Sequence, residues 1–269
     1  MPERGFATPG FLALALFGSL ATAFLVLPLA ILCVQSFTAE SYLSFPPPSF
    51  GLRWYRTVLA DPEWRQAAQS SLTIAAIVTP LSLVVGTLAA LGLDRGPMRG
   101  RNVIYGILIS PMILPHIVLG LGLFRIALDL EIDDSLWSIV PAHLTITIPF
   151  VVISVGASLQ SFDVGLEKAA QSLGANRFRA LWHITLPIIR PGLVGGGIFA
   201  FIMSFDEFII TYFLAVQTRT LPLEIFDSLR YQVSPSIAAV SALTIAASAA
   251  LTVALILRGQ VMAGGRIVQ

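Results

Sequence analysis

The chain has few charged residues, one cysteine and one lysine. Charged side chains make up 12% of its 269 residues, whereas soluble globular domains contain about 25%. Cys33 is the only cysteine, which excludes a disulfide within the chain and a metal site built from cysteines. Lys168 is the only lysine, and no G-x-x-x-x-G-K-[ST] motif contains it, so the chain lacks the phosphate-binding lysine of such a loop.

The charges that are present nearly balance. Sixteen basic and fifteen acidic residues leave a formal charge of +1, which implies no general attraction to nucleic acid or to anionic lipid. His116 and His143 lie far apart within apolar runs and have no cysteine near them. We therefore expect structural histidines, no metal site and no cofactor in this chain.

Apolar sequence is abundant. Hydrophobic residues make up 56% of the chain, and the mean hydropathy is +0.84. A helix needs about 20 apolar residues to cross the hydrocarbon of a bilayer, and only helices satisfy their own backbone there without closing a sheet. We predict one all-α integral membrane domain over residues 1–269, with six transmembrane helices at about 11–35, 70–93, 102–124, 136–160, 187–214 and 237–257.

The short connections between these windows differ in charge. Those after the second and fourth windows are basic, with Arg95, Arg99 and Arg101 in one and Lys168, Arg177 and Arg179 in the other. The connection after the third window is acidic, with Asp129, Glu131, Asp133 and Asp134. The positive-inside rule then predicts that both termini are cytoplasmic.

The connection at 162–186 is the longest polar segment predicted on the cytoplasmic side. Its pattern predicts two short helices hinged at Gly174, with Asp163 capping the first and Asn176 the second. Leu166, Ala169, Ala170 and Leu173 follow at helical spacing and form an apolar stripe with small residues in its middle. Such a stripe fits either a loop that folds back on its own helices or a surface that another protein approaches closely.

A signature motif lies in this loop. Ala169, Ala170, Gly174, Ile184, Leu186 and Pro187 match Glu-Ala-Ala, three residues, Gly, nine residues, Ile, one residue, Leu-Pro. The chain in this respect resembles the membrane subunits of ATP-binding-cassette (ABC) importers. Lys168 occupies the position of the signature glutamate, and Glu167 stands one residue earlier. Either Glu167 takes over the glutamate's contact through the helical offset, or that contact is absent.

The resemblance covers the chain from about residue 50 to the sixth window. Met-Ser-Phe-Asp-Glu-Phe at 203–208, Leu-Pro-Leu at 221–223 and Val-Ser-Pro at 233–235 are similar to the second permease subunit of spermidine/putrescine-type importers. The segment at 69–75 is similar to the start of that family's second span. The resemblance implies the fold of type I (MetI-like) ABC importer permeases.

The resemblance also implies partners and a location. We expect a homologous permease partner, a different chain in preference to a second copy of this one, two copies of a separate ATPase that bind ATP and Mg, and an extracytoplasmic solute-binding protein. The chain would be a multi-pass protein of the bacterial inner membrane that contacts lipid and no nucleic acid. The expected ATPase-coupling residues are Glu167, Lys168, Ala169, Ala170, Gly174, Ile184, Leu186 and Pro187.

Asp206 and Glu207 are costly residues within the fifth window. An ionisable group inside a span costs several kcal/mol unless it faces water, a partner or a cavity. A continuous helix from Pro187 would place Asp206 about 28 Å along its axis, near the outer mouth. One carboxylate could attract a cationic solute or set a gate, and Phe205 or Tyr212 could close that gate or hold a cation by its ring. Alternatively, both carboxylates reach the headgroups or pair with an arginine of a neighbouring helix.

The third window contains Pro111 and Pro115, which should bend or unwind it. The leading hypothesis for function is the permease of an ATP-driven importer of a polyamine, and the alternative solutes are a phosphonate, an opine or an amino-acid derivative. An ion-coupled secondary transporter would need its own ion site, commonly with inverted repeats, which the sequence does not display. An intramembrane enzyme would need a nucleophile–base pair or a metal cluster, and no convincing set is present.

Overall fold

The structure is a computed structural model, and it describes residues 9–96, 99–215, 218–231 and 234–264. Those residues are helical apart from turns and connections, with an isolated β-bridge between Thr38 and Phe50. Val233, in the predicted segment 233–235, lies outside the described residues. The all-α architecture that the apolar windows predict is therefore confirmed for the described part of the chain.

The chain divides into two compact units, residues 1–62 with 225–247 and residues 63–224 with 248–269. The first unit contains α1 (Pro9–Gln35) and α2 (Arg53–Ala60), and α12 (Leu221–Tyr231) and α13 (Pro235–Gly264) have residues in both units. The Ser36 and Tyr55 hydroxyls lie 2.5 Å apart and join the end of α1 to α2. The single permease domain predicted over residues 1–269 stays a prediction.

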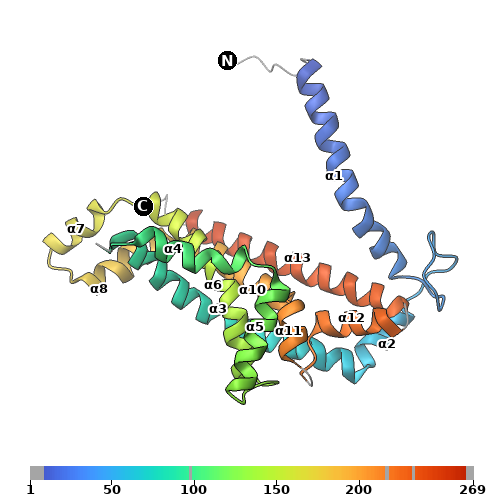
Figure 1. The fold of residues 1–269 in the computed structure, drawn as a ribbon. Helices are drawn as coiled ribbons and strands as arrows, with labels where there is room; N and C mark the ends of the chain where they lie inside the picture. Colours follow the sequence, from blue (N-terminus) through green and yellow to red (C-terminus); the bar gives the residue numbers. More distant parts are fainter. Residues whose placement is uncertain (1–8, 97–98, 216–217, 232–233, 265–269) are drawn as a thin grey trace. The chain divides into compact units, whose positions relative to one another are not determined.

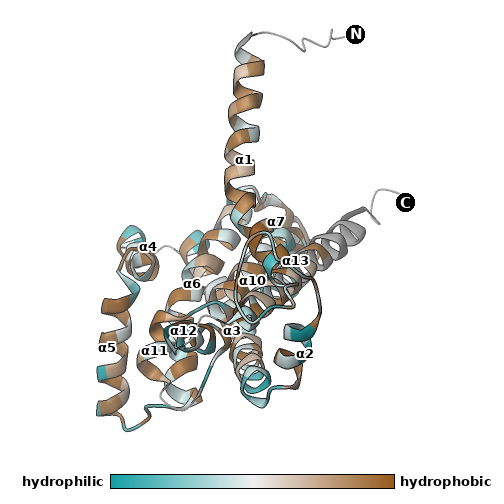
Figure 2. Cartoon of the chain, turned by 90° about the vertical axis from the view of Figure 1, so that its right-hand side faces the viewer, coloured by the Kyte–Doolittle hydropathy of each residue, from teal (hydrophilic) through white to brown (hydrophobic). Residues whose placement is uncertain are grey.

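Most residues of α1 are apolar, as the largely brown colouring of this helix in Figure 2 shows. Its large side chains are exposed, and Phe24, for example, is 76% exposed. An apolar helix of this length with no buried side chain among residues 10–35 suits contact with lipid.

The second unit is a helical bundle (Figure 1). Its elements follow in chain order as α3 (Pro62–Arg95), α4 (Arg101–Ile109), η1 (Ser110–Met112), α5 (His116–Asp129), α6 (Leu136–Gln160), α7 (Gly165–Ser172), α8 (Arg177–Ala180), η2 (Leu181–Thr185), α9 (Leu186–Ile188), α10 (Arg190–Phe205) and α11 (Ile209–Leu214). Of these, η1 is a 3₁₀-helix and η2 is a π-helix.

The core of this unit forms around α6. Val78 of α3 and Ile210 of α11 share one buried cluster with residues of α6, and Ala200 of α10 belongs to a second one. Glycine permits the close contact between α6 and α10, because a Cβ at Gly192 would lie 2.7 Å from the Ser154 carbonyl oxygen. The bundle therefore holds α10 tightly against α6 without large side chains between them.

The helices agree with the predicted windows in place but not always in continuity. Among the described residues, α1, α3 and α6 are long and apolar enough to span a membrane, and two bent helix pairs raise the number of candidates to five. The bent pairs are Arg101–Met112 with His116–Asp129, at 99°, and Arg177–Ile188 with Arg190–Phe205, at 71°. The count of six spans stays a prediction.

The third and fifth windows are not single helices. The break at Pro111 and Pro115 confirms the prediction that these prolines interrupt the third window. The continuous helix predicted over 187–214 is wrong, because the chain bends at Ile189 and α10 ends at Phe205, before α11 begins at Ile209. The second interruption is stabilised by side chains of α5 and α6, which a local pattern does not reveal.

Candidate functional site

The loop at 162–186, called the hairpin below, folds as its pattern predicts. Its two helical arms meet at Gly174, whose φ of +93° lies in the region that residues with a Cβ rarely adopt. The Asn176 side chain accepts a hydrogen bond from the Arg179 N–H at 2.8 Å and caps α8. Asp163 accepts one from the first N–H of α7 at 2.8 Å, although it stands one residue before the cap position. The predicted hinge and the Asn176 cap are therefore confirmed.

Glu167 turns toward the bundle and is buried. Its carboxylate lies 2.7 Å from the guanidinium of Arg95, the last residue of α3, and accepts a hydrogen bond from the Thr185 hydroxyl. The Arg95 guanidinium also lies over the Phe162 ring, 5.6 Å from its centroid. We call these four residues the anchor cluster, because they join both arms of the hairpin to α3.

Lys168, at the position of the signature glutamate, is exposed and makes no ion pair with any described residue. Neighbouring residues of a helix point about 100° apart, so Glu167 can face inward while Lys168 faces solvent. In this chain the glutamate next to the signature position thus makes a contact within the permease itself. Sequence reasoning used Arg95 for orientation only and missed it as the partner of Glu167.

The predicted apolar stripe of α7 is largely open to solvent. Leu173 is 90% exposed and Leu166 is 46% exposed, Ala169 is exposed as well, and Ala170 is half-buried. On the second arm, the rings of Phe178 and Trp182 stack at 6.1 Å and are exposed. The hairpin therefore presents apolar side chains outward instead of folding them back on the bundle.

The last motif residues attach the hairpin to the bundle. Ile184 and Leu186 pack against the buried cluster that α6 and α10 share. Pro187 lies in α9, near the end of the helical run, not in the first turn of the following long helix as predicted. Proline lacks an N–H and crowds the preceding turn, and the π-turn of η2 directly precedes α9. The chain then turns by 71° into α10.

The pathway candidates Asp206 and Glu207 lie in the break between α10 and α11. Asp206 is exposed, whereas Glu207 is only 5% exposed. Glu207 accepts a hydrogen bond from the Ile210 N–H at 2.7 Å, which caps α11, and its other oxygen lies 3.4 Å from Nδ1 of His116 at the start of α5. The two neighbouring carboxylates therefore face different surroundings, and of the two only Asp206 is exposed.

The aromatic gate candidates also lie on either side of this break. Phe205 is half-buried and stacks on Phe201 at 5.8 Å. Tyr212 is 44% exposed, and its ring contacts Phe208 and Phe213. That Phe205 or Tyr212 closes a gate or holds a cation by its ring stays a prediction.

His143 of α6 ties together the two helices that flank the break. Its Nδ1 lies 3.0 Å from the Ser204 hydroxyl on α10, and its Nε2 lies 2.9 Å from the Thr211 hydroxyl on α11. The Thr211 hydroxyl also donates a hydrogen bond to the Glu207 carbonyl oxygen at 3.1 Å. His143 is thus a satisfied structural histidine, and a lone histidine in an apolar run was the only signal of its role.

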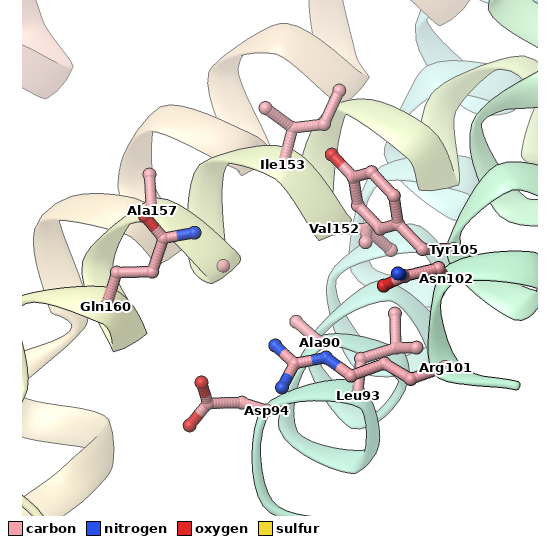
Figure 3. Close-up of a pocket in the computed structure, with 11 residues that line it drawn as sticks. Ala90, Leu93, Asp94, Arg101, Asn102, Tyr105, Val152, Ile153, Ala157 and Gln160 are labelled. Atoms are coloured by element: carbon pink, nitrogen blue, oxygen red, sulfur yellow. The ribbon is translucent and has the colours of Figure 1, made fainter. Parts of the chain in front are cut away.

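A pocket of about 350 Å³ opens between the ends of α3 and α6 and the start of α4. Figure 3 shows that the Arg101 side chain reaches toward Asp94, with Gln160 on the other side of the opening. None of the pathway candidates at 205–207 or 212 lines this pocket. Among the described residues, no group of three His, Cys, Asp or Glu side chains could hold a metal ion.

Two of the segments that carry the resemblance meet in space. The N–H of Leu221, which opens the Leu-Pro-Leu segment, donates a hydrogen bond to the Ser71 hydroxyl at 2.9 Å. Ser71 lies in the segment at 69–75 and is buried. This contact joins the start of α12 to α3 and gives both segments a shared structural role.

Comparison with known proteins places the sequence among transport proteins. Residues 82–262 match the family described as "Binding-protein-dependent transport system inner membrane component". The spermidine/putrescine transport system permease protein PotC of Escherichia coli (strain K12) is 32% identical over 233 residues, which cover 86% of this chain and 88% of that protein. PotC of Haemophilus influenzae is 33% identical over 233 residues, with 86% and 90% covered. The putrescine transport system permease protein PotI of E. coli is 32% identical over 232 residues, with 83% and 82% covered.

A solved structure has a similar fold. It is that of a bacterial ABC transporter involved in the import of the acidic polysaccharide alginate, and the TM-score is 0.74 at 17% sequence identity. The match covers 96% of this chain and 99% of that one. At this identity the similarity shows the fold alone.

Proposed function

The chain belongs to the family of binding-protein-dependent transport system inner membrane components, and we propose that it imports a polyamine. In this proposal, movement of the ATPase is transmitted to the permease through the hairpin. It is the permease of an ABC importer, homologous to PotC and PotI, and not the ATPase. ATP and Mg would be bound by the separate ATPase subunits.

The observation that carries the coupling role is the combination of an exposed surface and a fixed attachment in one hairpin. Leu166 on α7 and Leu173 at its end stay exposed, which suits close packing by another protein. The anchor cluster and the buried side of Ile184 and Leu186 join the same hairpin to α3, α6 and α10. A partner that moves the hairpin would therefore move these helices with it.

The attachment suggests how movement reaches the solute. The second arm of the hairpin includes η2, and the chain continues from it through α9 into α10. Helix α10 ends at the break that carries Asp206. Closure of the ATPases on ATP would pull the two hairpins of a permease pair together and open the pathway outward, and hydrolysis would return it inward. Such alternating access requires two discrete arrangements of the packed helices, which their rigid-body movement provides.

A polyamine is the substrate that the break favours. Asp206 is exposed and negatively charged in its ionised form, and its neighbour Glu207 is occupied by structural contacts. A carboxylate in a water-accessible part of a span attracts cations. The relatives PotC and PotI are named for spermidine and putrescine transport. A phosphonate, opine or amino-acid derivative would gain less from such a group.

The assembly that we propose contains a homologous but different permease chain, two copies of the ATPase and an extracytoplasmic solute-binding protein. A related alginate transporter is described in complex with its periplasmic protein. The basic connections at 95–101 and 168–179 support a chain of six spans with cytoplasmic termini and with the hairpin on the ATPase side. The coupling residues remain those of the signature, with Glu167 contributing through the anchor cluster.

The test is reconstitution of the chain with its neighbours in proteoliposomes. We expect a co-purifying ATPase whose turnover rises when a binding protein loaded with spermidine or putrescine is added, and ATP-dependent uptake of the labelled polyamine. Uptake driven by an ion gradient, by this chain alone, would instead support a secondary transporter. Stimulation by the binding protein loaded with another solute, and not with a polyamine, would reject only the substrate.

A further inference from the structure

The charges that face solvent on α7 and α8 are all positive. Glu167 is the one carboxylate on α7 and α8, and Arg95 neutralises it inside the anchor cluster. Lys168, Arg177 and Arg179 are exposed, and none of them makes an ion pair with a described residue. Asp163, an exposed carboxylate of the hairpin that precedes α7, accepts a hydrogen bond from the first N–H of α7.

We propose that the hairpin docks on an acidic surface of the ATPase, with Lys168 as the central cation. This inference rests on the proposed coupling role and specifies the chemistry of the partner. Because Glu167 is used within the permease, it is not available to pair with a basic group of the partner. Three exposed cations around an apolar stripe require carboxylates opposite them, since like charges across an interface cost several kcal/mol.

The geometry of the hairpin favours a folded protein over a lipid surface as the occupant. Ala169 and Ser172 are exposed on α7 next to Lys168, and such small side chains permit close approach of another backbone. Figure 1 places α7 and α8 at the outer end of their unit, beyond the ends of α4 and α6.

Lys168 is also positioned by the same contact that removes Glu167 from the surface. Since the two residues are about 100° apart on the helix, fixing Glu167 against Arg95 holds the side chain of Lys168 outward. The anchor cluster therefore sets both the sign of the docking surface and its orientation.

The experiment uses the assembled transporter, with the permease pair, the ATPase and the binding protein. Variants Lys168→Gln and Lys168→Glu remove and reverse the central charge, and Arg99→Glu reverses an exposed cation outside the hairpin as the matched control. We expect ATPase retention on the immobilised permease pair to fall about threefold for Lys168→Gln and at least about tenfold for Lys168→Glu. Arg99→Glu should retain the ATPase as the wild type does.

Salt and rescue distinguish a charge effect from damage to the fold. Retention by the wild type should weaken as salt rises, because screening acts on exposed pairs. Crosslinking to the hairpin identifies the facing surface of the ATPase. A carboxylate-to-lysine change on that surface should restore binding of Lys168→Glu. Unchanged retention by Lys168→Glu, with no salt dependence, would overturn the acidic partner while the coupling role stands. The acidic partner would also be overturned if Lys168→Glu retained the ATPase but lost binding to vesicles of anionic lipid. Failure of the wild type to retain any ATPase would instead reject the proposed function.

Discussion

Glu167 and Glu207 are both buried beside an exposed charged residue, but different partners hold them. Glu167 pairs with the Arg95 guanidinium at 2.7 Å. Glu207 accepts a backbone hydrogen bond at 2.7 Å, and its side chain lies 3.4 Å from the imidazole of His116. Arginine is always charged in proteins, whereas an imidazole carries charge only when protonated. The hairpin is therefore fixed by a permanent ion pair, and the break near Asp206 by a cap and a weaker pair.

The comparison separates two tasks that adjacent charged residues can perform. In each pair the buried glutamate holds an interrupted helix in place, while the exposed neighbour, Lys168 or Asp206, is open to a binding partner. Substitutions of the buried member should change the local structure, and substitutions of the exposed member should change recognition.

The largest effect is expected for Arg95→Ala. This change leaves the Glu167 carboxylate buried without its cation, and breaking such a pair costs about 3 kcal/mol, the lower end of the usual range because Arg95 is partly exposed. Hydrogen–deuterium exchange of residues 165–186 should accelerate by about a hundredfold. Arg99→Ala, outside the cluster, should leave exchange unchanged.

An apolar replacement of the whole pair sharpens this prediction. The double variant Arg95→Met with Glu167→Leu removes both charges and should recover most of the protection, since apolar residues of similar volume often replace buried ion pairs without loss. Exchange in Arg95→Ala at the wild-type rate would show that the pair does not hold the hairpin.

A smaller effect is expected at the break, where Glu207→Ala removes the acceptor for the Ile210 N–H. An unsatisfied buried donor costs about 1–3 kcal/mol, and loss of this cap should lower the maximal rate of uptake.

Asp206→Asn should instead raise the KM for a polyamine with little change in maximal rate, because it removes an exposed charge. Steady-state uptake in proteoliposomes measures both. Equal effects of the two variants on KM and rate would contradict the separation of tasks.

The smallest effect is expected for Gly174→Ala. No atom lies within 4 Å of a Cβ placed there, so the cost comes from the φ of +93° alone and amounts to about 1–2 kcal/mol. The melting temperature of the solubilised complex and the exchange of the hairpin should report it. Gly174→Asn should cost less, because asparagine tolerates this region better. Gly106→Ala, in a helix with open space around it, is the matched control and should be neutral or slightly stabilising.

Features with a local cause could be predicted from the sequence. Gly174 and Asn176 supply a turn and a cap by their own chemistry, and the prolines at 111 and 115 cannot continue a helix without a break. The hairpin and the bent third window follow from such residues.

Features that depend on distant residues could not be predicted. The signature pattern left two alternatives for Glu167, and only the folded chain brings Arg95 to it. The apolar run before Asp206 favours a continuous helix, whereas His143 and His116 reach the break from α6 and α5. No spacing within a single helix contains that information.

The π-turn at Leu181–Thr185 constrains the number of residues in this part of the hairpin more than their identity. Thr185 meets Glu167 because the wider turn sets its direction around the axis. Loss or gain of one residue there would rotate Thr185 by about 100° and carry Pro187 and α10 with it. Among related chains, substitutions of surface side chains in this turn should therefore be tolerated better than insertions or deletions there.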